Sequence, residues 1–193
     1  MTLAANLKAL QWYENEADYY ASLCGGISSA AGRPLRRLTE IVGEGGTVFE
    51  FGSGPGVEAD YLESLGVDVV RTDATAAFVE MQRARGKDAE QLNVITDDLG
   101  GPYQGVLSLC VLLHISVELT DQVLAKVAGA LAPGGAYLVS VRANAGRGRD
   151  IVWWKREEDF AERLERAGLR VEWSEHSVDS DDDAWWTFIA VRD

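Results

Sequence analysis

The sequence predicts an α/β fold: a three-layer, doubly wound, mostly parallel seven-stranded sheet, with an antiparallel last strand and N-terminal helices. Short runs rich in β-branched and aromatic residues alternate with helical segments along the chain. A glycine-rich turn at 52–56 follows the first of these runs. No helix separates the final two runs, so the last strand is expected to enter the sheet antiparallel, at an edge or as an insertion.

The N-terminal segment is expected to be helical. Apolar and aromatic residues recur at helical spacing from Leu3 to Leu23, and Gly25 follows them. A second helix is expected over 34–42, because proline is favoured in the first turn of a helix and glycine just after its end, as at Gly43.

The sheet is expected to start with the strand 47–51, where Thr, Val and Phe precede the glycine turn. Glycine ends three of the following segments, at Gly66, at Gly134 after Pro133, and at Gly168. The expected helices are 57–65, 75–85, 117–131 and 155–167, and the further strands are 67–71, 91–95, 105–112, 136–141, 169–174 and 187–191.

Composition and charge exclude several classes of protein. The chain has 193 residues, 47% of them hydrophobic, which suits one globular domain, and its net charge of −13 repels polyanions. The basic clusters at 33–37 and 142–149 are short and flanked by acidic segments, so no nucleic-acid partner is expected. We find no targeting peptide or bilayer-spanning run and expect a cytoplasmic protein without a membrane partner. Cys24 and Cys110 lack metal-ligand or redox spacing and are expected to be reduced thiols.

The turn from Glu50 to Gly56 reads Glu-Phe-Gly-Ser-Gly-Pro-Gly. Glycines adopt positive φ and let a ligand approach the backbone, and the following helix offers unpaired N–H groups. In open α/β sheets such a turn lies at the carboxyl ends of the strands, where ligands bind. We therefore predict a site for a nucleotide-like cofactor; the alternative is a tight turn without a ligand.

A dinucleotide fingerprint needs its third glycine at position 57, which is Val57, so that pattern is not met. The spacing Glu-x-Gly-x-Gly-x-Gly instead closely resembles the first motif of the seven-stranded class I S-adenosyl-L-methionine-dependent methyltransferases. Asp73 after the second strand, and the segments 96–99, 105–115 and 131–135, resemble later motifs of that family. Gln104 departs from the family, which usually has an acid at the start of the fourth strand.

The resemblance implies S-adenosyl-L-methionine as cofactor, with S-adenosyl-L-homocysteine as product. Glu50 would orient its amino acid end, Asp73 would accept both ribose hydroxyls, and Asp98 would border the adenine with Leu99. The residues expected to contact the cofactor are Glu50, Gly52, Ser53, Gly54, Gly56, Asp73, Ala74, Asp97, Asp98, Leu99, Leu109 and Cys110.

The resemblance also implies one class I methyltransferase domain over 1–193, with a helical lid at 1–43 and a Rossmann-like core at 44–193. The reaction would be an SN2 transfer of a methyl group from a sulfonium, with no covalent intermediate and no metal. The acids at 179–183 lack the spacing of a calcium loop and are expected to form a solvated turn.

His114 is the candidate catalytic residue, because an imidazole titrates near neutral pH and can act as a general base. Packing against the cofactor is the alternative role. The residues expected to contact the acceptor are Tyr13, Tyr19, Tyr20, His114, Arg142, Trp153 and Trp154, with Arg147 and Arg149 as further candidates for an anionic group. Core packing or a solvated loop is the alternative for these side chains.

The function predicted from these features is methyl transfer to an oxygen or nitrogen of a small molecule. Two alternatives stay open. An acidic surface also suits methylation of a cationic peptide or protein, and a cofactor-binding protein without transfer activity would carry the same motifs.

Overall fold

The computed structural model describes residues 3–27, 29–145 and 151–193. Its strands are β1 (Thr47–Phe51), β2 (Asp68–Asp73), β3 (Ala89–Gln91), β4 (Tyr103–Ser108), β5 (Leu131–Arg142), β6 (Leu169–Val178) and β7 (Ala184–Arg192). Its helices are α1 (Leu3–Leu23), α2 (Ser29–Val42), α3 (Val57–Ser64), α4 (Ala76–Ala84), α5 (Val117–Ala130) and α6 (Glu157–Arg166), with a short 3-10 helix η1 (Leu112–His114).

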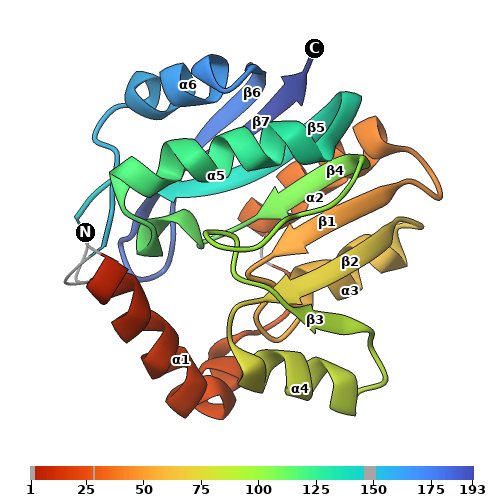
Figure 1. Ribbon diagram of the computed structural model, residues 1–193, viewed down its shortest axis with the longest axis vertical. Helices are drawn as coiled ribbons and strands as arrows, with labels where there is room; N and C mark the ends of the chain where they lie inside the picture. The colour runs from red at the N-terminus through yellow and green to blue at the C-terminus, as the bar shows by residue number, and fades with distance from the viewer. Residues whose placement is uncertain (1–2, 28, 146–150) are drawn as a thin grey trace.

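The strands form one seven-stranded sheet in the order β3-β2-β1-β4-β5-β7-β6. Helices α5 and α6 cover one face of this sheet, and α2 and α3 lie on the other (Figure 1). Strands β1 to β5 pair in parallel, whereas β7 pairs antiparallel with both β5 and β6. The predicted fold class is therefore confirmed, and the last strand is an insertion between β5 and β6. It runs antiparallel because a tight connection, without a crossover helix, joins it to β6.

Two strands end earlier than the residue pattern predicts. β3 ends at Gln91 rather than at position 95, because its parallel partner β2 ends opposite it at Asp73. β4 ends at Ser108 rather than at position 112, because Cys110 adopts a left-handed φ of 57° that does not occur in strands. The segments that follow β3 and β4 therefore leave the sheet and lie at the carboxyl ends of the strands.

The N-terminal helices have different roles in the fold. α1 has the predicted bounds, with a kink at Glu16 (φ −115°, ψ 19°). α2 begins at Ser29, earlier than predicted, and includes Pro34. Its Leu35 and Leu38 are fully buried in the cluster under the sheet, and tertiary packing of this kind outweighs the helix-breaking tendency of proline. Within the predicted lid at 1–43, α2 therefore belongs to the core, and α1 alone lies across the strand ends.

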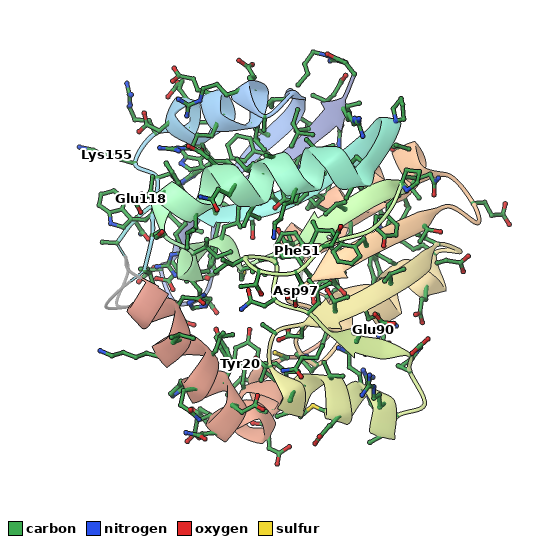
Figure 2. All side chains as sticks on the ribbon, viewed as in Figure 1. Tyr20, Phe51, Glu90, Asp97, Glu118 and Lys155 are labelled. Atoms are coloured by element: carbon green, nitrogen blue, oxygen red, sulfur yellow. The ribbon has the colours of Figure 1, made fainter. Side chains whose placement is uncertain are left out.

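Apolar side chains fill both faces of the sheet. One cluster lies beneath α5 and α6 and includes Phe51, Tyr137 and Phe160, and the other lies beneath α2 and α3. Phe51 lies in the interior, whereas charged side chains such as Glu118 and Lys155 lie at the surface (Figure 2).

A buried arginine joins α3 to the sheet. Arg71 on β2 is only 2% exposed. Its guanidinium forms ion pairs with Asp60 (2.8 Å) and Glu63 (2.6 Å), and its Nη1 donates to Gln82 Oε1 (3.2 Å). It also donates to the carbonyl of Gly56 (3.4 Å). The guanidinium therefore supports the glycine turn from the side opposite the strand ends.

We predict that Arg71→Leu lowers the free energy of unfolding by roughly 2–4 kcal/mol, because it leaves buried acceptors without donors. Arg170→Leu is the matched control, since Arg170 pairs with Glu172 and Asp193 at the surface. The control should change the stability by less than about 1 kcal/mol. Urea unfolding measures both values, and equal losses would contradict a structural role specific to Arg71.

Candidate active site

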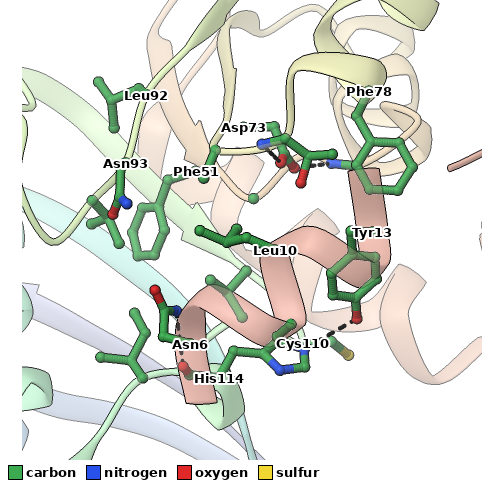
Figure 3. A pocket seen from close by; sticks show the side chains of 18 of the residues that line it. Asn6, Leu10, Tyr13, Phe51, Asp73, Phe78, Leu92, Asn93, Cys110 and His114 are labelled. Atoms are coloured by element: carbon green, nitrogen blue, oxygen red, sulfur yellow. Dashed lines mark hydrogen bonds between the residues drawn. The ribbon is translucent and has the colours of Figure 1, made fainter. Parts of the chain in front are cut away.

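A cavity lies at the carboxyl ends of β1 to β4, beneath α1 (Figure 3). This position is typical of small-ligand sites in α/β proteins. Three parts of the chain line the cavity. α1 contributes Asn6, Ala9, Leu10, Tyr13 and Tyr20, and the ends of β1 and β2 together with α4 contribute Phe51, Gly52, Gly54, Asp73, Ala74, Thr75 and Phe78. The segments after β3 and β4 contribute Leu92, Asn93, Val94, Ile95, Leu109, Cys110, Val111, His114 and Ile115.

The glycine turn needs glycine for conformation and for space. Gly52, Gly54 and Gly56 have φ values of 70°, 52° and 86°. A Cβ on Gly52 would lie 2.4 Å from Val111 Cγ2, and one on Gly56 would lie 2.6 Å from Gln82 Oε1. A Cβ on Gly54 would meet only the ring of Tyr20, at 4.0 Å, beside the cavity. Gly54 therefore leaves the backbone open to a ligand.

Asp73 fixes this turn. One of its carboxylate oxygens accepts from the Gly54 N–H and the other from the Thr75 N–H, both at 2.8 Å. The side chain is 6% exposed, and burial raises its pKa despite these two hydrogen bonds. Gln82 completes the support, since its Nε2 donates to Ser53 Oγ and to the Gly54 carbonyl, both at 2.8 Å. Asp73 and the turn therefore form a single hydrogen-bonded unit in the cavity wall.

Two further carboxyl groups lie behind the turn. Glu50 is 3% exposed, and its Oε2 has no hydrogen-bond partner among the described residues. Burial raises the pKa of Glu50, and the nearby Glu58 raises it further; burial also raises the pKa of Glu58. No lysine or arginine among the described residues lines the cavity. This end of the site therefore favours a cation over an anion.

The expected cofactor contacts divide into three groups. Gly52, Gly54, Asp73, Ala74, Leu109 and Cys110 line the cavity. Glu50, Ser53 and Gly56 lie behind its wall, where they support the turn. Asp97, Asp98 and Leu99 lie outside it.

The third group lies outside the cavity because β3 ends early. Asp97 accepts from the Asn93 N–H and from Thr96, Asp98 accepts from the Gly100 N–H, and Leu99 is buried in the core. The cavity is instead lined by Leu92, Asn93, Val94 and Ile95, which directly follow the strand. The shortness of β3 was not visible in the sequence.

His114 lies in the cavity wall, and its Nε2 is 3.1 Å from the Tyr13 hydroxyl (Figure 3). Burial lowers the pKa of His114 to about 4 and raises that of Tyr13 to about 12. At neutral pH the imidazole is therefore uncharged, and its tautomer decides whether Nε2 accepts from the phenol or donates to it. Cys110 also borders the cavity, and it is exposed.

The residues expected to contact an acceptor are only partly brought together. Tyr13, Tyr20 and His114 line the cavity, whereas Tyr19 is 58% exposed on the outer side of α1. Arg142 forms an ion pair with Asp183, and Trp154 packs against Phe160, so neither lies in the cavity wall. Trp153 is 42% exposed and also lies outside the wall. Arg147 and Arg149 lie outside the described residues.

Sequence reasoning did not identify Asn6, Leu10 or Phe78 as lining residues. Asn6 and Leu10 share the cavity-facing side of α1 with Tyr13, at helical spacing, so the tyrosines themselves were the signal that could have found them. Within the described ranges, no cluster of His, Cys, Asp or Glu is placed to hold a metal ion. Over the same ranges, no helix has the length and apolar character needed to cross a bilayer.

Part of the sequence resembles known methyltransferases. Residues 49–137 match the model of a methyltransferase domain. A ribosomal protein L11 methyltransferase from Pelotomaculum thermopropionicum is 30% identical over 162 residues, which are 82% of this chain and 47% of that protein. The chain therefore spans about half the length of the curated relative that it matches.

Solved structures share the fold at low sequence identity. A magnesium protoporphyrin IX methyltransferase from Synechocystis PCC 6803, with bound SAH, has a TM-score of 0.76 at 15% identity, over 97% of this chain and 99% of that chain. A 1,6-didemethyltoxoflavin-N1-methyltransferase from Burkholderia thailandensis has a TM-score of 0.74 at 18% identity, over 97% and 86%. A TehB-like SAM-dependent methyltransferase from Corynebacterium glutamicum has a TM-score of 0.69 at 19% identity, over the full length of both chains.

The pKa of His114 predicts a pH-dependent stability. Its ordinary value is 6.5, and the folded value is about 4, so the unfolded chain binds a proton between these values and the folded chain does not. The neutral imidazole of His114 therefore contributes fully to the free energy of unfolding above about pH 6.5, and this contribution is lost as the pH falls toward 4. Between pH 7 and 4, the free energy of unfolding of the native protein should fall by on the order of 1–3 kcal/mol more than that of His114→Gln. Parallel stability curves from urea unfolding would contradict a buried, neutral imidazole.

Proposed function

We propose that this chain is a class I S-adenosyl-L-methionine-dependent methyltransferase, which transfers a methyl group from S-adenosyl-L-methionine to an oxygen or nitrogen of a small molecule. S-adenosyl-L-homocysteine is then the second product. The magnesium protoporphyrin and toxoflavin enzymes that share the fold are named for small-molecule acceptors.

The observation that carries the proposal is the charge around the glycine turn. Glu50 Oε2 is buried without a partner, and Glu58 and Asp73 lie nearby with pKa values raised by burial. An ammonium and a sulfonium would stabilise the ionised forms of these carboxyl groups, which Arg71 offsets only from behind the turn, whereas the pyrophosphate of a dinucleotide would be repelled. The residues present therefore fit S-adenosyl-L-methionine better than NAD.

The cavity wall provides a place for each part of this cofactor. We assign the amino acid end to the side of Gly52 and Gly54, with Glu50 behind them, and the ribose to Asp73. The carboxylate oxygens of Asp73 each accept one backbone N–H, which leaves lone pairs for the ribose hydroxyls. Leu109 and Cys110 border the methionine portion, and the segment 92–95 borders the base.

The bound cofactor supplies a methyl group on a sulfonium that is already reactive toward nucleophiles. The protein's task is then to hold the acceptor in line and to exclude water, which contributes up to about 7–11 kcal/mol in favourable cases. α1 performs this task by covering the strand ends with Leu10, Tyr13 and Tyr20.

We assign proton removal to Tyr13 and His114. An oxygen that has received a methyl group while still protonated is a strong acid, so a base with a pKa of about 4 is sufficient to deprotonate it. The acceptor proton moves to the Tyr13 oxygen while the Tyr13 proton moves to His114 Nε2, 3.1 Å away. His114 is the terminal base in this proposal, and Tyr13 is the group that meets the acceptor.

A protein acceptor is the second candidate. The curated relative is named for methylation of ribosomal protein L11, and the net charge of −13 suits a basic partner. The position of the cavity beneath α1 favours a small acceptor instead. A screen with methyl-labelled cofactor against hydroxylated and amino compounds, and against basic ribosomal proteins, separates the two; labelling of neither class favours a binding protein without transfer activity.

Titration calorimetry with S-adenosyl-L-methionine, S-adenosyl-L-homocysteine and NAD tests the cofactor assignment. The first two should bind and NAD should not. Asp73→Ala should weaken their binding by about tenfold or more, the scale of one charge-assisted hydrogen bond. Asp68→Ala, at the exposed start of the same strand, is the matched control and should bind normally. Unchanged binding by Asp73→Ala would remove Asp73 from the site.

For an oxygen acceptor found in the screen, His114→Gln should lower kcat by roughly 10²–10⁴-fold, the usual contribution of a general base. Tyr13→Phe should also lower kcat and should abolish the acidic limb of the pH profile that reports His114. Both variants should bind S-adenosyl-L-homocysteine as the native protein does. A kcat within about twofold of the native value in His114→Gln would show that no base at this position is used.

A further inference from the structure

The outer side of α2 carries a group of positive charges on an otherwise acidic protein. Arg33, Arg36 and Arg37 follow helical spacing, so their side chains lie on one side of the helix. All three are exposed. They line a surface depression between α2 and α3, whose other residues are Ile27, Gly32, Glu40 and Tyr61. Because the whole chain has 18 basic and 31 acidic side chains, this arginine surface is a local exception to its charge.

Two of the three arginines have no carboxylate partner. Arg33 forms an ion pair with Glu175 on β6, at 2.7 Å. Within residues 3–27, 29–145 and 151–193, no acidic side chain forms an ion pair with Arg36 or Arg37, although Glu40 lines the same depression. The charges of Arg36 and Arg37 are therefore not neutralised by a direct contact in the described structure.

Aromatic rings position both of these arginines. The Cζ atom of Arg36 lies 5.6 Å from the centre of the Tyr61 ring, and that of Arg37 lies 5.3 Å from the centre of the Trp173 ring on β6. A cation–π contact uses the charge of a guanidinium but none of its N–H donors. Since the ring contacts already restrict the two side chains, binding a ligand costs less side-chain entropy at these positions.

The exposure and charge of the arginine surface restrict the kind of ligand that it suits. The side chain of Arg33 is 63% exposed, whereas small-molecule sites enclose most of their ligand. A second copy related by a two-fold axis would place the arginines against the same arginines. A nucleic acid would bring a dense row of phosphates into the field of a net charge of −13. A protein segment with only a few carboxylates meets none of these objections.

We infer that the arginine surface is a docking site for an acidic segment of a partner protein. Carboxylates of this segment pair with Arg36 and Arg37, because a carboxylate accepts two N–H groups from one guanidinium. Its apolar side chains contact Tyr61 and Trp173, and arginine, tyrosine and tryptophan carry much of the binding energy at protein interfaces. Ile41, which is 43% exposed one turn beyond Arg37, extends the apolar contact. The docking site does not depend on the proposed function, since α2 and Trp173 lie outside the cavity wall.

Fluorescence anisotropy with a labelled synthetic peptide tests this docking site. The peptide carries aspartate and glutamate around a central phenylalanine, and a second peptide carries asparagine and glutamine in their place. The native protein should bind the acidic peptide about tenfold more tightly than the amide peptide, despite its own net charge of −13. Raising the salt concentration from about 50 to 300 mM should weaken this binding severalfold, because salt screens exposed charges.

Arg36→Glu/Arg37→Glu should weaken the binding of the acidic peptide by about tenfold or more. Arg156→Glu/Arg166→Glu is the matched control, because it changes the net charge by the same amount at exposed positions at the two ends of α6, on the other face of the sheet (Figure 1). It should bind the peptide within about threefold of the native protein. Arg36→Gln/Arg37→Gln, which removes the charges without reversing them, should have an intermediate affinity. Urea unfolding checks that all three variants are folded.

Four results would overturn the docking site for an acidic segment. The first two are equal binding of both peptides by the native protein, and equal weakening in the α2 and α6 charge-reversal variants, which would reflect net charge alone. Displacement of the peptide by inorganic phosphate, beyond the effect of chloride at equal ionic strength, would assign the surface to a phosphate group. A dimer of the native protein that dissociates in Arg36→Glu/Arg37→Glu, measured by analytical ultracentrifugation, would assign the surface to a second copy.

Discussion

The carboxylate of Asp73 is the constraint on which the site depends. It holds the N–H groups of Gly54 and Thr75, and so joins the turn after β1 to the turn after β2. Gln82 and Arg71 hold the same turn from behind, through Ser53 and the carbonyls of Gly54 and Gly56. Because these partners are buried, the left-handed glycines keep one conformation and the cavity is formed before a ligand arrives.

The network has an electrostatic consequence. Burial places Glu50, Glu58 and Asp73 beside the turn without a cation in the cavity wall, as far as the described residues show. Burial disfavours the ionised form of each of these carboxyl groups, and a bound cationic ligand would offset that cost. Carboxyl groups beside a strand-to-helix turn suit a cationic ligand better than a phosphate, although Arg71 behind the turn offsets part of their charge.

The cavity is lined by the strand ends and by α1 together. The strand ends supply the floor of the cavity, and α1 supplies Asn6, Tyr13 and Tyr20 from one side of a single helix. Two of these residues are bonded to His114, which follows β4. His114, the residue proposed to take up a proton, is therefore positioned by α1, the same helix that covers the cavity.

The sequence by itself determined the strand–turn–helix at Thr47–Ser64 and the antiparallel last strand, because positive-φ glycines and a missing crossover helix act locally. It also determined Asp73 as the acid at the turn. Only the tertiary structure decided where β3 stops, and hence that Asn93 rather than Asp97 lies in the cavity wall. It also decided that Arg142 pairs with Asp183, and that Asn6 and Tyr13 meet His114. These outcomes depend on hydrogen-bond register and on contacts between residues far apart in the chain, which local spacing does not encode.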